Sequence, residues 1–342
     1  MQLDDRAQAL LTWLTSLYPE AAAQFALRPA SSDASFRRYW RFDLPTGSKI
    51  AMDAPPAHER CDHFIEAARL FKQAGVNVPE IEATDLQNGF LVLTDFGLTE
   101  ALYVHLLTPE SGHALYLDAI DALIRFQVES LQATNQTAFP PYNETLLRQE
   151  IQLFPEWYVK IHKQKHFSPE AQQQFDQVTE LILANNLAQP TVWVHRDYHS
   201  RNLMLTRENS PGILDFQDAV TGPITYDLVS LLKDAYIGWE EEARLDWVVR
   251  YWERAKKAGL PVNPMIDEFY RDFEWMGVQR HLKVLGIFAR LNHRDNKPQF
   301  LQNMPLVVHY LRETTKRYLE LNPLYVLINQ LEEIETTINY TF

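Results

Sequence analysis

One polar stretch of the sequence combines side chains suited to proton transfer with side chains suited to metal binding. It runs from Val194 to Asn202 and includes His195 and Asp197, and Asp215 follows 13 residues after the asparagine. A carboxylate such as Asp197 can accept the proton of a nearby hydroxyl group. The oxygens of Asn202 and Asp215 are ligands that Mg²⁺ prefers, and two protein ligands leave room for phosphate oxygens and water. The spacing therefore predicts phosphoryl transfer to a hydroxyl group beside a bound metal ion.

Two short strands are expected to hold this stretch in place. Residues 191–194 and 210–216 are apolar and strand-like, and we expect them to pair as a hairpin. Helical periodicity surrounds the hairpin, over 113–132, 143–163 and 168–187 and from Tyr226 onward. The earlier part of the chain predicts helices at 3–27 and 60–74 and strands at 36–42, 49–53, 78–84 and 89–94. We expect an α+β fold, with a small antiparallel β lobe at 1–97 and a larger helical lobe at 98–342.

The polar stretch and its strands resemble the catalytic hairpin of the aminoglycoside phosphotransferase family, a branch of the protein-kinase-like fold. His199 stands where the small-molecule members of that family carry a histidine, and the segment 226–229 resembles a downstream motif. Within the family the chain is most similar to the anomeric sugar kinases of cell-wall recycling, which phosphorylate N-acetylmuramic acid and N-acetylglucosamine at O1. The segments that carry this second resemblance are 34–39, 52–56, 90–95, 214–219 and 222–231.

The resemblance implies a role for each residue of the hairpin. Asp197 becomes the catalytic base or hydroxyl-orienting carboxylate, and Asn202 and Asp215 become the Mg²⁺ ligands. His195 and Asp227 are expected to brace the loop. The phosphate donor is expected to be ATP, because the family consists of kinases.

The nucleotide side of the resemblance departs from the kinase pattern. The phosphate-covering loop is not rich in glycine, and the hydroxyl residues Ser32 and Ser35 occupy its place. Asp95 and Phe96 begin a D-F-G triplet, but it precedes the catalytic stretch, so we interpret it as a hinge whose backbone meets adenine. Asp53 stands where kinases carry the third-strand lysine. Substitute cations are expected from Lys49, Arg37, Arg38 or Arg41, with Glu66 as the candidate partner.

A basic segment late in the chain bears on the acceptor. At helical spacing Arg280, Lys283, Arg290 and Arg294 share one face, and apolar residues occupy the opposite face. This face is expected either to be a solvated helix surface or to meet an anion, such as the lactyl carboxylate of N-acetylmuramic acid. We predict that His199, Arg280 and Lys283 bind the substrate.

Composition excludes several other classes of protein. The net charge of −13 argues against nonspecific nucleic-acid binding, and the one cysteine, Cys61, cannot form an internal disulfide. No two glycines are spaced G-x-G, so Rossmann and Walker motifs are absent. An acidic opening segment and the lack of an 18-residue apolar stretch favour a cytoplasmic protein without a membrane span. No obligate protein partner is implied. Alternatives to an amino-sugar kinase are an aminoglycoside, choline or homoserine-type kinase, or a nucleotide-binding pseudokinase.

Overall fold

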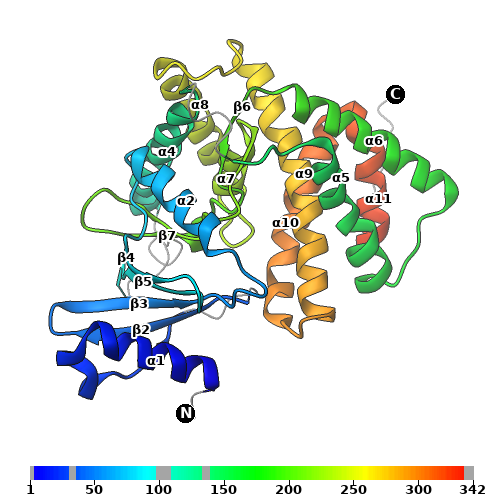
Figure 1. Cartoon of the computed structure of the whole chain (residues 1–342). Coiled ribbons are helices and arrows are strands. Elements are labelled where there is room, and N and C mark those ends of the chain that lie inside the picture. Colours follow the sequence, from blue (N-terminus) through cyan, green and yellow to red (C-terminus); the bar gives the residue numbers. More distant parts are fainter. Residues whose placement is uncertain (1–3, 31–35, 98–108, 133–138, 335–342) are drawn as a thin grey trace, which may run out of the picture. The chain divides into compact units, whose positions relative to one another are not determined.

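The computed structural model describes residues 4–30, 36–97, 109–132 and 139–334 (Figure 1). The chain divides into two compact units. The first unit contains the N-terminal part of the chain together with residues 202–218, and the second contains residues 107–201 and 219–342. The predicted boundary at residues 97 and 98 stays a prediction, because residues 98–108 lie outside the described part of the chain. Each unit is described by itself below.

The first unit is built on an antiparallel five-stranded sheet with the order β1-β2-β3-β5-β4. Its strands are β1 (Arg28–Pro29), β2 (Arg38–Leu44), β3 (Gly47–Asp53), β4 (Ile81–Asp85) and β5 (Phe90–Thr94). Its helical elements are α1 (Asp5–Leu17), η1 (Pro19–Gln24) and α2 (Cys61–Gln73). Helix α1 lies against the sheet (Figure 1) and buries Leu10 and Leu14 against Trp40 and Phe42. The predicted antiparallel β lobe is confirmed.

The first helix is shorter than the sequence predicted. Its periodicity was expected to continue to residue 27, but α1 ends at Leu17 and Pro19 begins the 3-10 turn η1. Proline lacks the backbone N–H that an α-helix interior requires, so the helix cannot continue through this position. The apolar residues beyond it continue the same core, because Phe25 and Leu27 pack against that cluster.

The strand pairing around the polar stretch differs from the expected hairpin. Strand β6 (Thr191–Val194) pairs with β9 (Val220–Pro223), and β7 (Leu203–Met204) pairs with β8 (Gly212–Ile213). The predicted strand 210–216 is shorter because Asp215 has a φ of 62°, in the left-handed region, which ends extended backbone. Strand β9 gave little signal, since it has four residues and two of them are glycine and proline.

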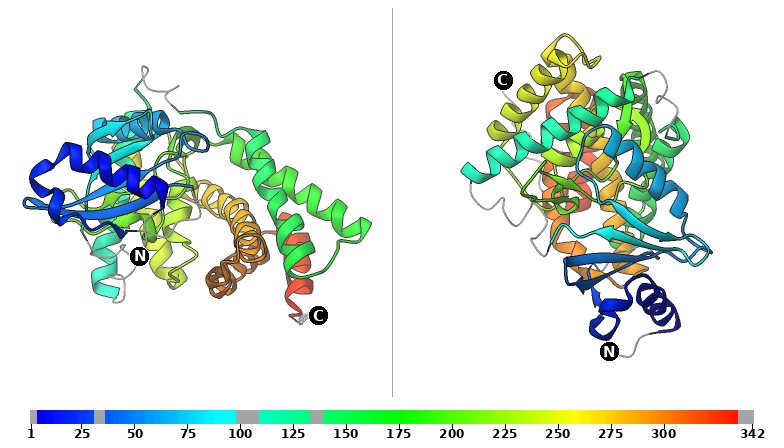
Figure 2. Two further views of the ribbon diagram at one scale, coloured as in Figure 1. Left: turned by 60° about the horizontal axis from the view of Figure 1, so that its bottom comes forward. Right: turned by 60° about the vertical axis from the view of Figure 1, so that its left-hand side comes forward.

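The second unit is helical apart from the β6–β9 pair (Figure 2). Its elements are α4 (Pro109–Ser130), α5 (Glu144–Leu153), η2 (Phe154–His162), α6 (Pro169–Ala188), α7 (Tyr226–Leu232), α8 (Glu241–Lys257), α9 (Ile266–His293), η4 (Pro298–Asn303), α10 (Met304–Arg317), η5 (Leu319–Leu321) and α11 (Asn322–Glu332). The predicted helix 143–163 is divided, because its second half, η2, is a π-helix. No helix in the described residues has the length and hydropathy needed to cross a bilayer.

Helix α9 is the central helix of the second unit, with α5, α7, η2 and α10 packed around it. At Gly286 a Cβ atom would lie 2.5 Å from the backbone of Leu153, so a glycine is required for this close approach. The expectation of a solvated basic face is wrong for Arg280 and Lys283, which are both buried. Lys283 and Glu274, two of the buried charges on α9, each have an ion-pair partner.

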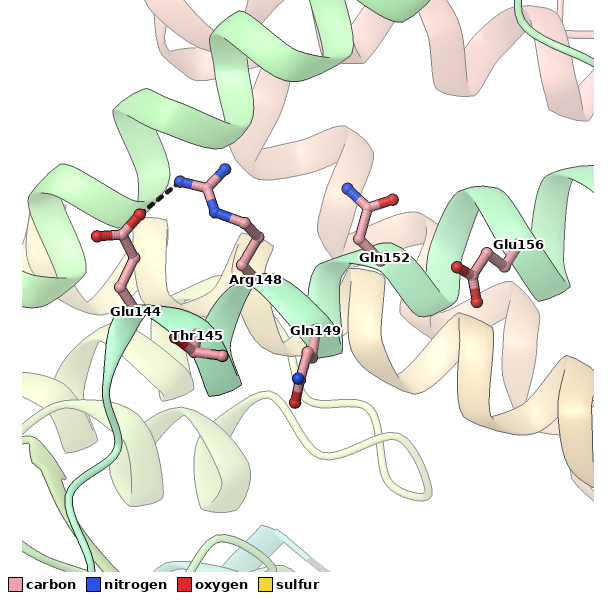
Figure 3. A pocket seen from close by; sticks show the side chains of 6 residues that line it. All are labelled: Glu144, Thr145, Arg148, Gln149, Gln152 and Glu156. Atoms are coloured by element: carbon pink, nitrogen blue, oxygen red, sulfur yellow. Dashed lines mark hydrogen bonds and ion pairs between the residues drawn. The ribbon is translucent and has the colours of Figure 1, made fainter.

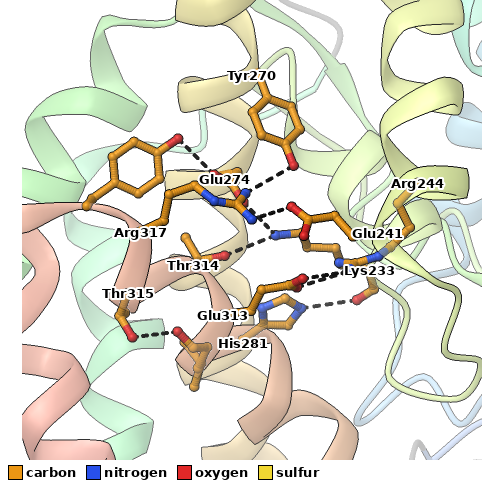
Figure 4. Close-up of polar contacts among 12 residues, drawn as sticks. Lys233, Glu241, Arg244, Tyr270, Glu274, His281, Glu313, Thr314, Thr315 and Arg317 are labelled. Atoms are coloured by element: carbon orange, nitrogen blue, oxygen red, sulfur yellow. Dashed lines mark hydrogen bonds and ion pairs between the residues drawn. The ribbon is translucent and has the colours of Figure 1, made fainter. Parts of the chain in front are cut away.

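A buried polar cluster ties α9 to α10 and to the end of α7 (Figure 4). The Glu274 carboxylate is fully buried and accepts hydrogen bonds from Lys233 Nζ at 3.3 Å, Arg317 Nη1 at 2.6 Å and the Tyr318 hydroxyl at 2.8 Å. Lys233 Nζ also donates to Thr314 Oγ1 at 3.0 Å. Each buried charge therefore has an opposite charge and further hydrogen bonds, which offset the cost of removing it from water.

Candidate active site

Strand β6 leads directly into the loop that carries Asp197, and a buried carboxylate holds this loop by its backbone. Asp227, on the first turn of α7, accepts hydrogen bonds from the backbone N–H of His195 at 2.6 Å and of Arg196 at 3.0 Å. Arg196 has a φ of 76°, an uncommon conformation for a residue with a side chain. The two hydrogen bonds stabilise this strained turn, and the predicted bracing role of Asp227 agrees with this geometry.

The far end of the same loop is held by a second carboxylate. Asp234 accepts hydrogen bonds from the hydroxyl and the backbone N–H of Ser200, the latter at 3.0 Å, and from the backbone N–H of Tyr236 at 3.0 Å. The Arg201 guanidinium lies 3.7 Å from the centre of the Tyr236 ring. The loop is therefore fixed at both ends, and Asp197 lies between two buried anchors.

The charges around Asp197 keep it ionised. Burial raises the pKa of this carboxyl, but the surrounding cations, Lys283 foremost, outweigh burial and lower the pKa to about 2. Burial raises the pKa of Asp227 to about 7, against the lowering effect of its two backbone hydrogen bonds. Burial also lowers the pKa of His199, which favours the neutral imidazole. At neutral pH Asp197 is thus a weak base suited to accept a hydrogen bond from a hydroxyl group.

Two of the predicted substrate residues lie on α9. Arg280 Nε donates to Ser230 Oγ at 2.6 Å, while its Nη1 has no hydrogen-bond partner among the described residues. His199 Nδ1 is likewise buried with no such partner within the described part of the chain. Lys283 Nζ instead has internal partners, the Glu150 carboxylate and the Tyr226 hydroxyl, both at 2.9 Å. Direct binding of the acceptor by these residues stays a prediction.

The two predicted metal ligands lie together in the first unit. Asn202 Nδ2 lies 3.4 Å from Asp215 Oδ2, and the backbone N–H of Leu214 donates to the Asn202 carbonyl at 2.9 Å. Gln217 Nε2 donates to the other oxygen of Asp215 at 2.7 Å. The hairpin is anchored to the sheet unit, because Ile213 N donates to the Asn77 carbonyl at 2.7 Å. An amide and a carboxylate held side by side are a donor set that fits Mg²⁺.

The predicted nucleotide residues of the sheet unit are engaged in ion pairs. Lys49 pairs with Glu82 at 2.5 Å, Arg37 with Glu59 at 2.7 Å, and Arg41 with Asp95 at 2.5 Å. The Phe96 ring lies over Gly212, where an added Cβ would come within 2.7 Å of it. Ser32 and Ser35 lie outside the described residues. Binding of the nucleotide stays a prediction for Ser32, Ser35, Arg37, Lys49, Asp95 and Phe96.

The structure explains why Asp53 stands where kinases carry the third-strand lysine. Asp53 has no exposed side-chain surface and pairs with Arg6 at 2.5 Å and Arg38 at 2.6 Å. This carboxylate therefore joins α1 to β2 and β3. The expected pairing of Glu66 with a substitute cation is wrong, because Glu66 is exposed and pairs with Arg69 on its own helix, while Lys49 pairs with Glu82.

Sequence reasoning missed Glu150, Asp234 and the partners of Asp53. Glu150 contacts Arg196 across 46 positions of the sequence and Asp234 contacts Ser200 across 34, and a single acidic residue gives no sequence signal of such a contact. A hollow of about 460 Å³ along α5 and η2 (Figure 3) contains none of the predicted site residues; it is lined by Glu144, Thr145, Arg148, Gln149, Gln152 and Glu156.

Comparison with known proteins agrees with this geometry. Residues 26–261 match the phosphotransferase enzyme family APH, and the chain belongs to this family. It is similar over nearly its whole length to two curated proteins named N-acetylmuramate/N-acetylglucosamine kinase. The protein of Neisseria meningitidis serogroup B is 48% identical, covering 97% of this chain and 98% of its own. The protein of Pseudomonas aeruginosa is 44% identical, covering 97% of this chain and 99% of its own.

Solved structures confirm the predicted protein-kinase-like fold. The choline kinase of Cryptosporidium parvum superposes with a TM-score of 0.65 at 12% identity, covering 92% of this chain and 98% of that one. An ADP-bound aminoglycoside phosphotransferase superposes with a TM-score of 0.59 at 14% identity, covering 91% of this chain and 99% of that one. These structures confirm the predicted fold class, and the family match and the two curated proteins confirm the predicted family and phosphotransferase activity.

Proposed function

We propose that the chain transfers phosphate from ATP to the anomeric hydroxyl of N-acetylmuramic acid, N-acetylglucosamine or both, in peptidoglycan recycling. The observation that carries the proposal is the near full-length similarity to two proteins named for these sugars, at 48% and 44% identity. Support also comes from Asp197, Asn202 and Asp215. Asp197 provides the carboxylate that accepts the proton of the sugar hydroxyl, and Asn202 and Asp215 provide the metal ligands that a kinase needs. We propose a cytoplasmic enzyme, as expected from the sequence.

In the proposed reaction Asp197 accepts a hydrogen bond from the anomeric hydroxyl. As that oxygen attacks the γ-phosphorus of ATP, its proton passes to the carboxylate, the bond to the β–γ bridging oxygen breaks, and ADP leaves with the electron pair. The low pKa of Asp197, about 2, makes it a weak base. An anomeric hydroxyl suits such a base, since the ring oxygen makes it more acidic than an ordinary alcohol. Mg²⁺ held by Asn202 and Asp215 would supply positive charge beside the phosphates.

Two polar atoms are available for the acceptor in the second unit. Arg280 Nη1 and His199 Nδ1 are buried and have no hydrogen-bond partner among the described residues. A buried donor or acceptor without a partner is costly, and a bound sugar supplies hydroxyl, amide and carboxylate groups that satisfy it. We therefore propose that Arg280 and His199 contact the sugar, and that Lys283 acts on Asp197 through its charge.

The alternatives have weaker support. The choline kinase and the aminoglycoside phosphotransferase share the fold at 12% and 14% identity, which says nothing about a shared acceptor. A pseudokinase commonly lacks one of the three catalytic positions, and here all three are present. A screen of ADP release with amino sugars, aminoglycosides and amino alcohols separates these functions. We expect turnover with the two N-acetylated sugars; turnover with choline or an aminoglycoside alone would overturn the proposal.

A further inference from the structure

A buried carboxylate lies behind the catalytic loop and holds two cations at once. Glu150, on α5, has one oxygen, Oε1, at 2.5 Å from Arg196 Nη2 and at 2.9 Å from Lys283 Nζ. Its other oxygen, Oε2, accepts a hydrogen bond from the Tyr142 hydroxyl. One side chain thus connects the loop that carries Asp197 with the central helix α9.

The surroundings of Glu150 leave these cations little freedom. Lys283 Nζ also donates to the Tyr226 hydroxyl at 2.9 Å, and the rings of Tyr142 and Tyr226 meet edge to face at 5.2 Å. The Arg196 guanidinium lies 5.6 Å from the centre of the Tyr142 ring. Glu150 and Lys283 are both buried. Such a network fixes the positions of its side chains, because Arg196 and Lys283 can both contact the Glu150 carboxylate in only one arrangement.

Both cations act on Asp197. Arg196 is the residue before it, and its left-handed backbone, with a φ of 76°, sets the direction in which the aspartate leaves the turn. Lys283 is the foremost of the cations that lower the pKa of Asp197 against burial, and Arg280 and Arg196 act in the same direction. The neighbouring Asp227 carboxylate faces the same loop.

We propose that Glu150 is a positioning residue of the catalytic loop: by orienting Arg196 and Lys283 it fixes both the direction and the charge of Asp197. This inference rests on the proposed function, since it takes Asp197 as the group that meets the acceptor hydroxyl. Arg196 then serves the loop through its side chain as well as through its backbone. Lys283, held in place by Glu150, contributes a fixed positive charge that acts on the Asp197 carboxylate.

The first test is Glu150→Gln, which keeps the shape of the side chain and removes its charge. A displaced catalytic group lowers kcat more than substrate binding, so we expect kcat to fall about 10- to 100-fold with little change in KM for ATP. The matched control is Glu144→Gln on the same helix, where the carboxylate is exposed and pairs with Arg148 at 2.7 Å (Figure 3). The control is expected to keep wild-type kcat; an equal loss in both variants would overturn the proposal.

A second variant separates positioning from folding. Glu150→Gln leaves Arg196 and Lys283 without their shared carboxylate and adds one net positive charge, whereas Glu150→Gln combined with Lys283→Met retains the net charge of the network. We expect the double variant to unfold near the wild-type temperature, with a kcat at least about 10-fold below that of Lys283→Met alone. A purely structural role for Glu150 predicts that this folded double variant matches Lys283→Met in kcat to within about twofold, and that result would overturn the proposal.

The single variant Lys283→Met tests whether the charge of Lys283 lowers the pKa of Asp197. Without this cation the pKa of Asp197 rises, so the acid limb of kcat is expected to move to higher pH by about one unit or more; an unchanged limb would contradict the role of Lys283. If the wild-type chain phosphorylates neither sugar, the proposed function fails by itself. The same variants are then compared by their hydrolysis of ATP in the absence of an acceptor, and the criteria for Glu150 stay the same.

Discussion

Replacement of Asp227 by asparagine is expected to remove one pH-dependent part of the free energy of unfolding. Asp227 is fully buried, and burial raises its pKa to about 7. Because this lies above the value of an unfolded aspartate, near 3.9, the folded chain binds more protons between the two values. The stabilisation is therefore complete below about pH 4 and is lost as the pH rises through about 7. Between pH 8 and pH 6 the wild-type chain is expected to gain about 1.4 kcal/mol from this group.

The assay is urea unfolding of the wild-type chain and Asp227→Asn at pH 6, 7 and 8 and constant ionic strength. At every pH the variant leaves one of the two backbone N–H groups without an oxygen acceptor, which costs about 1–3 kcal/mol. The difference between the two proteins is expected to grow by about 1.4 kcal/mol as the pH falls from 8 to 6. Asp246→Asn, at an exposed position on α8, is the control. A difference that is constant, or that grows toward pH 8, would refute the reasoning, since the ionised carboxylate would then be the stabilising form.

Three further substitutions test other parts of the structure. Asp197→Asn is expected to keep nucleotide binding and to lose about 10²–10⁴ in kcat; more than a tenth of wild-type kcat in steady-state kinetics would contradict its role. Asp215→Ala is expected to weaken Mg-ATP binding far more than metal-free ATP binding in calorimetry, and equal losses would make it a structural residue. Glu274→Gln leaves buried Lys233 without its carboxylate and is expected to cost about 3–5 kcal/mol in chemical unfolding. Glu274→Gln combined with Lys233→Met should recover most of that loss, and no recovery would contradict the ion-pair explanation.

The sequence predicts local features of this site well, because they depend on spacing. Strand 191–194 begins and ends at the predicted residues, and the loop that follows carries Asp197. The helix expected at 60–74 is present as α2, at Cys61–Gln73. In each of these segments the apolar periodicity and the helix- or strand-breaking residues of the sequence predict the element that the structure contains.

Long-range contacts are not encoded in such spacing. The partner of β6 is β9, and its Gly222 is required because a Cβ would come within 2.8 Å of Tyr142. Nothing in the order of residues indicates that contact. The burial of Lys283 was also unpredictable, since helical periodicity treats a charged face as an exposed one and Glu150, its partner, lies on another helix. Buried ion pairs therefore become visible only with the three-dimensional fold.

The most direct test of the proposed function is the position of the phosphate in the product. The chain is incubated with Mg-ATP and N-acetylmuramic acid or N-acetylglucosamine, and the product is examined for a reducing end and for release of phosphate in mild acid. An anomeric phosphate is an acetal phosphate, so it is expected to be acid-labile and to leave no reducing end, and methyl glycosides blocked at O1 should be inert. An acid-stable phosphate on a sugar that still reduces, or methyl glycosides phosphorylated as fast as the free sugars, would contradict the account.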